Sequence, residues 1–186
     1  MADGSPLALL LNGTYGVGKS AVLDHLGDLL AEAGRPFSLM DVDWFHRSWP
    51  PAPWDPENVA VEARAMAATW ALFQEAGPRQ LVVSGVVEER ADVDRYRDAL
   101  GIDVRCVLLT ASPEVVEARL RTRYDDDRRA ARDWHLARHA DLATRIATSG
   151  LHEAAIATDG RTPREVARAV LDALDADAAA RWASAG

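Results

Sequence analysis

The segment Gly-Thr-Tyr-Gly-Val-Gly-Lys-Ser at residues 13–20 constrains the fold of this chain more than any other feature. It matches the pattern G-x-x-x-x-G-K-[ST], which is the phosphate-binding P-loop. Its glycines permit positive φ, so backbone N–H groups can approach an anion closely, and the helix that follows points its positive end at the same anion. Lys19 is the only lysine among 21 lysines and arginines, and it occupies the lysine position of the motif. We therefore predict a binding site for a nucleoside triphosphate.

The sequence on both sides of the loop supports this interpretation over a glycine-rich turn without a ligand. A continuous apolar run at residues 7–11 precedes it, as in a strand buried on both faces, and apolar residues at helical spacing follow it up to Gly34. Lys19 would place a mobile positive charge on the β- and γ-phosphates, and Ser20 would offer its hydroxyl to Mg²⁺. The residues expected to contact the nucleotide here are Gly13, Thr14, Tyr15, Gly16, Val17, Gly18, Lys19, Ser20 and Ala21.

Length and composition indicate a single domain over residues 1–186. The chain has no apolar run of about 18 residues, so we expect no membrane span. The net charge of −8 argues against broad nucleic-acid binding. The first apolar run is too short for a signal peptide, and the lone Cys106 excludes an internal disulfide. We expect a cytoplasmic protein whose oligomeric state the sequence leaves open.

Strand and helix patterns alternate along the whole chain, which predicts an α/β fold. We expect a doubly wound sheet of five parallel strands, flanked by helices. The second long helix should begin with Asp55 as N-cap and Pro56 as its first residue, and later helices should begin after Ser112 and after a Thr162 capping box. The expected strands are 7–11, 37–42, 81–87, 104–110 and 154–157, and a further helix is expected at about 133–148.

Four features in a fixed order carry a resemblance to a known family. They are the P-loop, Asp-x-Asp at the end of the second strand, an arginine-rich segment after the fourth strand, and Asp-Gly-Arg-x-Pro before the last helix. This order resembles the small P-loop kinases, which include shikimate and gluconate kinases, chloramphenicol phosphotransferase, tunicamycin-resistance-type proteins and nucleoside monophosphate kinases. Over residues 7–175, the resemblance implies an ATP site, Mg²⁺, a mobile lid at about 121–133 and an acceptor-binding segment at about 43–78.

Asp41 and Asp43 follow the second strand, and strand ends line the ligand crevice of open α/β sheets. Similarity to the Asp-x-Asp of shikimate kinase implies that Asp41 reaches the hydration shell of Mg²⁺ and that Asp43 binds the acceptor hydroxyl and takes its proton. The alternative is that both simply cap a surface turn. The third strand ends without a carboxylate until Glu88, so either Asp41 or a water-linked Glu88 would support the metal.

Arginines crowd the expected lid, where closure would bring guanidinium groups onto the transferred phosphoryl group. We expect Arg121 to contact the nucleotide and Arg128 to be catalytic together with Lys19 and Asp43. The alternative is a solvated, self-paired helix surface. The resemblance also places Gly160, Arg161 and Pro163 beside adenine. The members of the cluster are Arg119, Arg121, Arg123, Arg128, Arg129 and Arg132.

Three tryptophans interleaved with prolines directly follow Asp43. They would form an apolar wall for a ring-bearing acceptor or, equally well, cover the edge of the sheet. The end of the third strand and the start of the next helix should also approach the acceptor. The tryptophans are Trp44, Trp49 and Trp54, and the full set of expected acceptor contacts is Asp43, His46, Arg47, Trp54, Ser84, Gly85 and Arg90.

These features favour an ATP-dependent kinase that transfers the γ-phosphoryl group to a hydroxyl of a sugar, nucleoside or antibiotic-like acceptor. Such an enzyme would serve in resistance or biosynthesis. One alternative is a nucleoside monophosphate kinase, for which Arg47 and Arg64 would bind the acceptor phosphate, although Asp43 would repel a dianion. A further alternative is a nucleotide-binding module without phosphoryl transfer.

Overall fold

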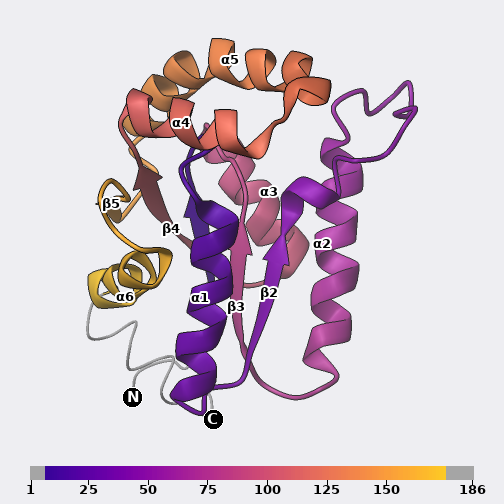
Figure 1. The fold of residues 1–186 in the computed structure, drawn as a ribbon. Coiled ribbons are helices and arrows are strands. Elements are labelled where there is room, and N and C mark those ends of the chain that lie inside the picture. The colour runs from indigo at the N-terminus through magenta and orange to yellow at the C-terminus, as the bar shows by residue number, and fades with distance from the viewer. Residues whose placement is uncertain (1–6, 175–186) are drawn as a thin grey trace.

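The computed structural model describes residues 7–174, so both ends of the domain expected over residues 1–186 lie outside the described residues. Five parallel strands form one sheet in the order β2-β3-β1-β4-β5, which confirms the predicted α/β fold (Figure 1). The strand that carries the P-loop is therefore central, and the strand that ends at Asp41 lies two positions away. The strands are β1 (Leu7–Asn12), β2 (Phe37–Asp41), β3 (Gln80–Ser84), β4 (Asp103–Thr110) and β5 (Ala154–Ala157).

The central strand β1 is buried along its whole length because helices cover both faces of the sheet. Side chains alternate between the faces of a strand, so Leu9 and Leu11 join one half of the core while Ala8 and Leu10 join the other. This arrangement explains why β1 appears in the sequence as an uninterrupted apolar run instead of an alternating one.

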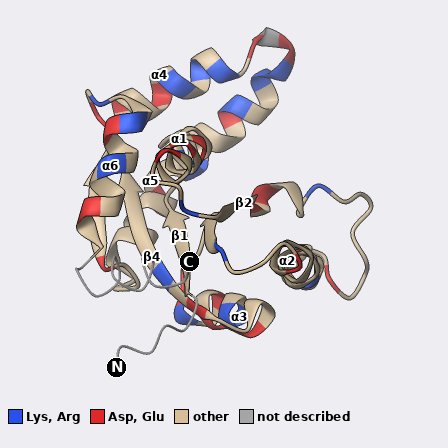
Figure 2. Ribbon diagram, turned by 90° about the horizontal axis from the view of Figure 1, so that it is seen from below, with Lys and Arg blue, Asp and Glu red and all other residues tan. Residues whose placement is uncertain are grey.

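Six α-helices surround the sheet in three pairs (Figure 1). One pair covers each face, and the third pair lies across the end of the sheet where the strands finish. Figure 2 shows that charge is carried by the helices and loops, whereas the central strands are almost free of it. The pairs are α1 (Lys19–Glu32) with α6 (Pro163–Ala173), α2 (Val59–Gln74) with α3 (Arg90–Leu100), and α4 (Pro113–Arg123) with α5 (Arg129–Thr148).

The predicted start of α2 was wrong by three residues. The helix begins at Val59, and Asn58 before it has a left-handed backbone with φ of 55°. Asp55 nevertheless performs the capping, because its carboxylate accepts the backbone N–H groups of Ala60 at 3.1 Å and Val61 at 2.9 Å across the intervening loop. An acidic side chain can thus satisfy free helix N–H groups without being the adjacent residue.

Other predicted boundaries differ by smaller amounts. β2 ends at Asp41 because the chain turns there into a short 3₁₀ helix, η1 (Val42–Trp44), and β3 ends at Ser84 instead of continuing to Val87. The helix expected at about 133 begins at Arg129, after a second 3₁₀ turn, η2 (Asp126–Arg128). The Ser112 cap of α4 and the Thr162 capping box of α6 are confirmed.

Within residues 7–174, the helices are too short or too polar for any of them to cross a membrane.

Candidate active site

The P-loop lies between the end of β1 and the first turn of α1, where two of its glycines have no possible substitute. Gly13 has φ of +150°, and a Cβ placed on it would lie 2.6 Å from the carbonyl oxygen of Leu109. Gly18 has φ of +102° at the N-cap of α1. A side chain would be strained at either position, so the glycine spacing of the motif is a requirement of this backbone.

Asn12, which the sequence analysis did not identify, fixes the start of the P-loop. Its side chain is fully buried, and its Oδ1 accepts the N–H groups of Gly13 at 2.8 Å and Val87 at 3.1 Å. Its Nδ2 donates to the carbonyl of Val87 at 2.7 Å and contacts His152 Nε2 at 2.8 Å. One amide thereby joins the P-loop to the segment after β3. The sequence did contain a signal for this role, because Asn12 is a polar residue directly after the apolar run of β1.

The side chain of Lys19 folds back over its own loop. Its Nζ donates to the carbonyl oxygens of Gly13 at 2.8 Å and Thr14 at 3.3 Å, and the side chain is buried. Burial lowers the pKa of this ammonium, while the charges of Asp43 and Asp41 oppose that shift. The cation is thus held at the loop and lies within the electrostatic reach of both carboxylates.

Ser20 and Asp41 meet beside the P-loop. The Ser20 hydroxyl donates to Asp41 Oδ2 at 2.8 Å, and the other carboxylate oxygen of Asp41 accepts the backbone N–H of Asp43 at 3.2 Å. No cluster of three or more histidine, cysteine or acidic side chains within residues 7–174 is arranged to hold a metal. A hydroxyl and one carboxylate do suit Mg²⁺, which binds few protein oxygens and takes its remaining ligands from phosphate and water.

Asp43 is the middle residue of η1, next to the end of β2. It is exposed to solvent, yet its charge influences groups from several elements. It raises the pKa of Lys19 and of Tyr15 in the P-loop, and it also raises the pKa of His135 on α5, although burial dominates the shift at each of the three. An exposed carboxylate therefore faces the phosphate loop, as expected for a group that meets an incoming hydroxyl.

The arginines of α4 are divided between two faces of the helix. Arg119 Nη1 donates to the carbonyl of Val17 at 3.0 Å and to Thr158 Oγ1 at 2.8 Å, so it links the P-loop to the end of β5. Arg121 points to the other face and pairs with Glu117 at 2.9 Å. The sequence analysis expected Arg121 at the nucleotide and did not single out Arg119. The apolar Val116, which is buried, marks the inner face of α4. Arg119 follows it by three residues and lies on the same face, so helical spacing from Val116 could have distinguished Arg119 from Arg121.

Two further arginines of the expected lid, Arg123 and Arg128, lie over the ring of Tyr124. The guanidinium of Arg128 is 4.8 Å from the centre of the Tyr124 ring, and that of Arg123 is 5.7 Å from it. The charge of Arg123 also lowers the pKa of Lys19, after the larger effect of burial, which places Arg123 near the phosphate loop. Of the two, Arg123 is the one that lies within electrostatic reach of Lys19.

Helix α5 packs directly on the P-loop, a contact that no sequence motif predicted. The ring of Tyr15 lies 4.3 Å from His135 and 5.5 Å from Trp134, measured between ring centres, and Thr14 Oγ1 is 2.8 Å from His139 Nδ1. Burial lowers the pKa of both histidines, which favours their neutral form. The helix that carries the end of the expected lid therefore touches the loop that would hold phosphate.

The loop between β5 and α6 is attached to α4. Asp159 accepts the N–H of Ser112 at 2.9 Å and its hydroxyl at 2.6 Å, and these hydrogen bonds lower the pKa of the Asp159 carboxyl. Gly160 follows with a left-handed backbone, and Arg161 and Pro163 lead into α6. Because Arg119 bonds Thr158 just before this loop, the expected adenine side and the P-loop are joined by one side chain.

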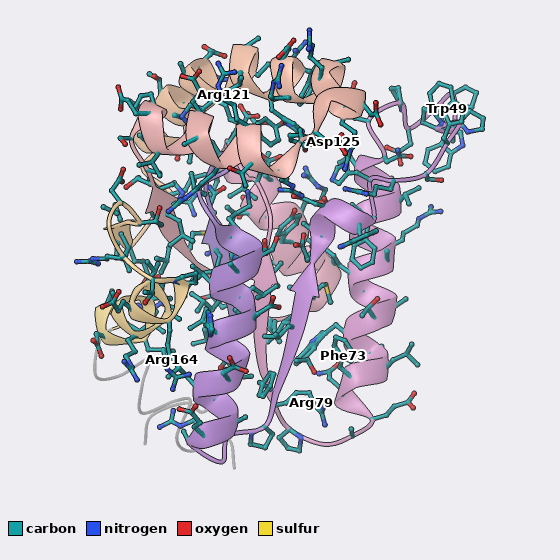
Figure 3. All side chains as sticks on the ribbon, in the orientation of Figure 1. Trp49, Phe73, Arg79, Arg121, Asp125 and Arg164 are labelled. Carbon is teal, nitrogen blue, oxygen red and sulfur yellow. The ribbon has the colours of Figure 1, made fainter. Side chains whose placement is uncertain are left out.

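The three tryptophans after Asp43 are exposed and do not cover the edge of the sheet. Trp44 and Trp54 are each 65% exposed, and Trp49 is 90% exposed at the outer end of the loop between β2 and α2 (Figure 3). Arg47 lies 4.5 Å from the Trp44 ring centre, and Arg64 lies 5.7 Å from that of Trp54. These arginines stack on indoles, so the loop presents apolar rings together with positive charge.

The other expected acceptor residues differ in how accessible they are. Ser84 is fully buried at the end of β3, and its hydroxyl has no hydrogen-bond partner among residues 7–174. Gly85 packs so closely that a Cβ would lie 2.8 Å from Val42. Arg90 is exposed at the start of α3. Both ring nitrogens of His46 are engaged within the protein, by Glu62 and by the carbonyl of Glu57.

Fold and P-loop together define a P-loop nucleotide-binding protein. The chain belongs to the AAA domain family, whose model matches residues 9–139. That match contains the P-loop, Asp41, Asp43 and the expected lid. Among curated proteins, none is matched to this chain by sequence.

Several solved structures that share this fold are named as kinases. A gluconokinase from Sinorhizobium meliloti 1021 is 19% identical with a TM-score of 0.62, and the match covers 97% of this chain and 98% of that one. The APS kinase CysC of Mycobacterium tuberculosis, solved with AMPPNP and APS, is 19% identical with a TM-score of 0.62, covering 91% and 97%. An unliganded sugar kinase from Janibacter sp. HTCC2649 is 20% identical with a TM-score of 0.60, covering 90% and 93%.

Proposed function

We propose that this protein is an ATP-dependent kinase that phosphorylates a hydroxyl group of a small molecule such as a sugar, a nucleoside or an antibiotic-like compound. The observation that carries the proposal is the solvent-exposed carboxylate of Asp43, whose charge acts on the buried ammonium of Lys19. A gluconokinase, a sugar kinase and an APS kinase solved with AMPPNP share the fold and support it.

In this proposal, each group has a role in the transfer. The oxygen of the acceptor hydroxyl forms a bond to the γ-phosphorus while the bond from that phosphorus to the bridging oxygen of ADP breaks. Asp43 orients the hydroxyl and takes its proton, and Lys19 offsets the negative charge on the transferred group. Backbone N–H groups of the P-loop hold the phosphates in line for this displacement.

Mg²⁺, when bound, would neutralise charge on the β- and γ-phosphate oxygens. Ser20 and Asp41 would hold it, because their oxygens already lie 2.8 Å apart beside the loop. Glu88 is less suited, since its carboxylate pairs with Arg145 on α5 at 2.8 Å.

The lid proposed at about 121–133 would close over the nucleotide. We assign the nucleotide contact to Arg119 because it already bonds the P-loop, and the phosphoryl contact to Arg123 because its charge reaches Lys19. Arg128 stacks on the Tyr124 ring, so it would contact the transferred phosphoryl group only after a movement of the lid. Arg121, which is paired with Glu117 in solvent, is left without a proposed role.

A screen for ATP consumption tests the proposal. Purified protein with Mg²⁺ and ATP is incubated with panels of sugars, nucleosides, hydroxyl-bearing antibiotics and nucleoside monophosphates, and ADP release is followed. Turnover with a hydroxyl compound is the expected result. Transfer to a monophosphate would establish the nucleotide kinase instead, and ATP binding without turnover on any panel would favour a regulatory module.

Replacement of Arg119 by alanine is expected to raise the KM for ATP by about 10-fold, because it removes charge-assisted hydrogen bonds that tie the P-loop to the end of β5. Arg121→Ala is the matched control, since it removes the same charge from the outer face of α4 and should leave the KM within about twofold. Equal effects of the two substitutions would show that only the net charge of the lid matters.

A further inference from the structure

The segment 44–58, which carries the three exposed tryptophans, is fixed at its base. Asn58 Nδ2 donates to the carbonyl oxygens of His46 at 3.1 Å and Ser48 at 3.3 Å. His46 Nδ1 lies 3.1 Å from the carbonyl oxygen of Glu57, near the other end of the segment. The two ends of the loop are therefore tied together, while its tip at Trp49 extends into solvent (Figure 3).

A side-chain contact between His46 and Glu62 attaches this loop to α2, in addition to the bonds that Asp55 makes with the first turn of the same helix. Glu62 lies on α2 with its side chain only 3% exposed, and its carboxylate meets His46 Nε2 directly. A buried carboxylate requires a charged or hydrogen-bonding partner. Because the two nitrogens of His46 face an oxygen of Glu62 and a backbone carbonyl, both can donate only when the ring is an imidazolium.

The charges around His46 favour that protonated form. The hydrogen bond with Glu62 is the largest effect and raises the pKa of His46; Asp43 raises it further, and burial opposes both. On the far side, Tyr96 of α3 also hydrogen-bonds Glu62, and Arg95 lies near that ring. Burial raises the pKa of Asp55, the residue that caps α2, but the backbone N–H groups it accepts lower that pKa, and the positive charge of His46 adds to the lowering.

We propose that Glu62 is a positioning residue for the acceptor side of the site. Through the imidazolium of His46, it fixes the segment 44–58 relative to Asp43, which stands three residues before His46. His46 then acts as an anchor and not as a direct ligand of the acceptor, since both of its N–H groups are used within the protein. The inference rests on the proposed kinase function, which makes this loop the wall of the acceptor site.

Glu62→Gln tests the inference, with Glu57→Gln as the control. Both remove one negative charge near His46, but the Glu57 side chain is exposed and only its backbone carbonyl contacts the ring. In Glu62→Gln, the pKa of His46 measured by NMR should fall toward the ordinary value of 6.5, and the indole signals of Trp44 and Trp54 should move. Glu57→Gln should leave both measurements nearly as in the wild type.

The kinetic measurement uses the compound with the highest turnover in the screen. Its KM should rise by about 10-fold in Glu62→Gln, while the KM for ATP stays within about twofold, because the P-loop is untouched. If the screen finds no substrate, the kinase proposal fails, and the NMR titration still decides whether the anchor exists. An unchanged His46 pKa or unmoved indole signals in Glu62→Gln would overturn the inference.

Should Glu62→Gln not fold, His46→Gln takes its place. Glutamine keeps a neutral donor toward Glu62 but removes the positive charge. The indole signals of Trp44 and Trp54 should again move, and the acceptor KM should rise. Wild-type indole signals with a normal acceptor KM would contradict the anchor role.

The same contact predicts how stability depends on pH. Since the pKa of His46 is raised above 6.5 in the folded protein, the pair stabilises the fold fully below pH 6.5 and loses this contribution as pH rises through the raised value. In urea unfolding, wild type should exceed Glu62→Gln in stability by more at pH 6 than at pH 9. A difference that does not change with pH would show that the pair does not titrate.

Discussion

Replacing Asp43 by asparagine is expected to lower kcat by about 10²–10⁴-fold while ATP affinity stays nearly unchanged. The amide keeps the size of the side chain but can no longer take the proton of the acceptor hydroxyl. The backbone N–H of Asp43, which bonds Asp41, is retained, so the turn that carries the side chain should keep its shape. Single-turnover kinetics and ATP titration would separate the chemical step from binding.

Asp41→Asn is the matched control for this substitution. It neutralises a carboxylate only two residues away, but one that bonds Ser20 at the expected metal position. We expect it to raise the Mg²⁺ concentration needed for half-maximal activity instead of abolishing the chemical step. If Asp43→Asn lost ATP affinity while the rate per bound enzyme stayed normal, Asp43 would be structural or a metal ligand.

Lys19→Ala is expected to lower kcat by about 10²–10³-fold, because it removes a positive group aimed at the charge that develops on the phosphoryl oxygens. ATP affinity should fall as well, by about 10-fold or more, with the loss of a charge-assisted hydrogen bond. Isothermal titration with ATP and initial rates with the best acceptor from the screen would measure the two effects.

A control on folding is necessary for this variant because Lys19 also bonds the carbonyl oxygens of Gly13 and Thr14. Urea unfolding should show that the fold survives, since those bonds lie within one loop that follows the central strand of the sheet. A folded Lys19→Ala protein with wild-type turnover would contradict the kinase proposal altogether.

The sheet could be predicted from sequence because its signals are local. The apolar run of β1 reflects burial on both faces, and Ser112 and Thr162 cap the helices that directly follow them. The start of α2 was missed because Asp55 caps that helix across a loop closed by Asn58 in a left-handed conformation. Local sequence preferences do not reveal a cap that acts at a distance.

The sequence predicted the candidate site where the residues belong to a motif of fixed spacing, such as the P-loop, or stand at the end of a predicted strand. Ser20 of the P-loop meets Asp41, which was expected at the ligand crevice because it ends the second strand. Arg119 was named in the arginine cluster but not singled out, because charge alone does not distinguish the two faces of α4. The pair of His46 and Glu62 depends on a contact across sixteen residues, and no short pattern encodes such a contact.

The burial of Lys19 has a consequence for covalent modification of the protein. Apart from the N-terminal amine, every acylation of an amine in this chain, whether by an acetylating enzyme or an amine-reactive reagent, must occur at the phosphate loop, since no other lysine exists. The amine is buried and hydrogen-bonded there, so bound nucleotide should shield it further. The other formal cations of the chain are arginines, which such reagents do not modify. The rate at which Lys19 reacts would therefore report directly how often the phosphate loop opens.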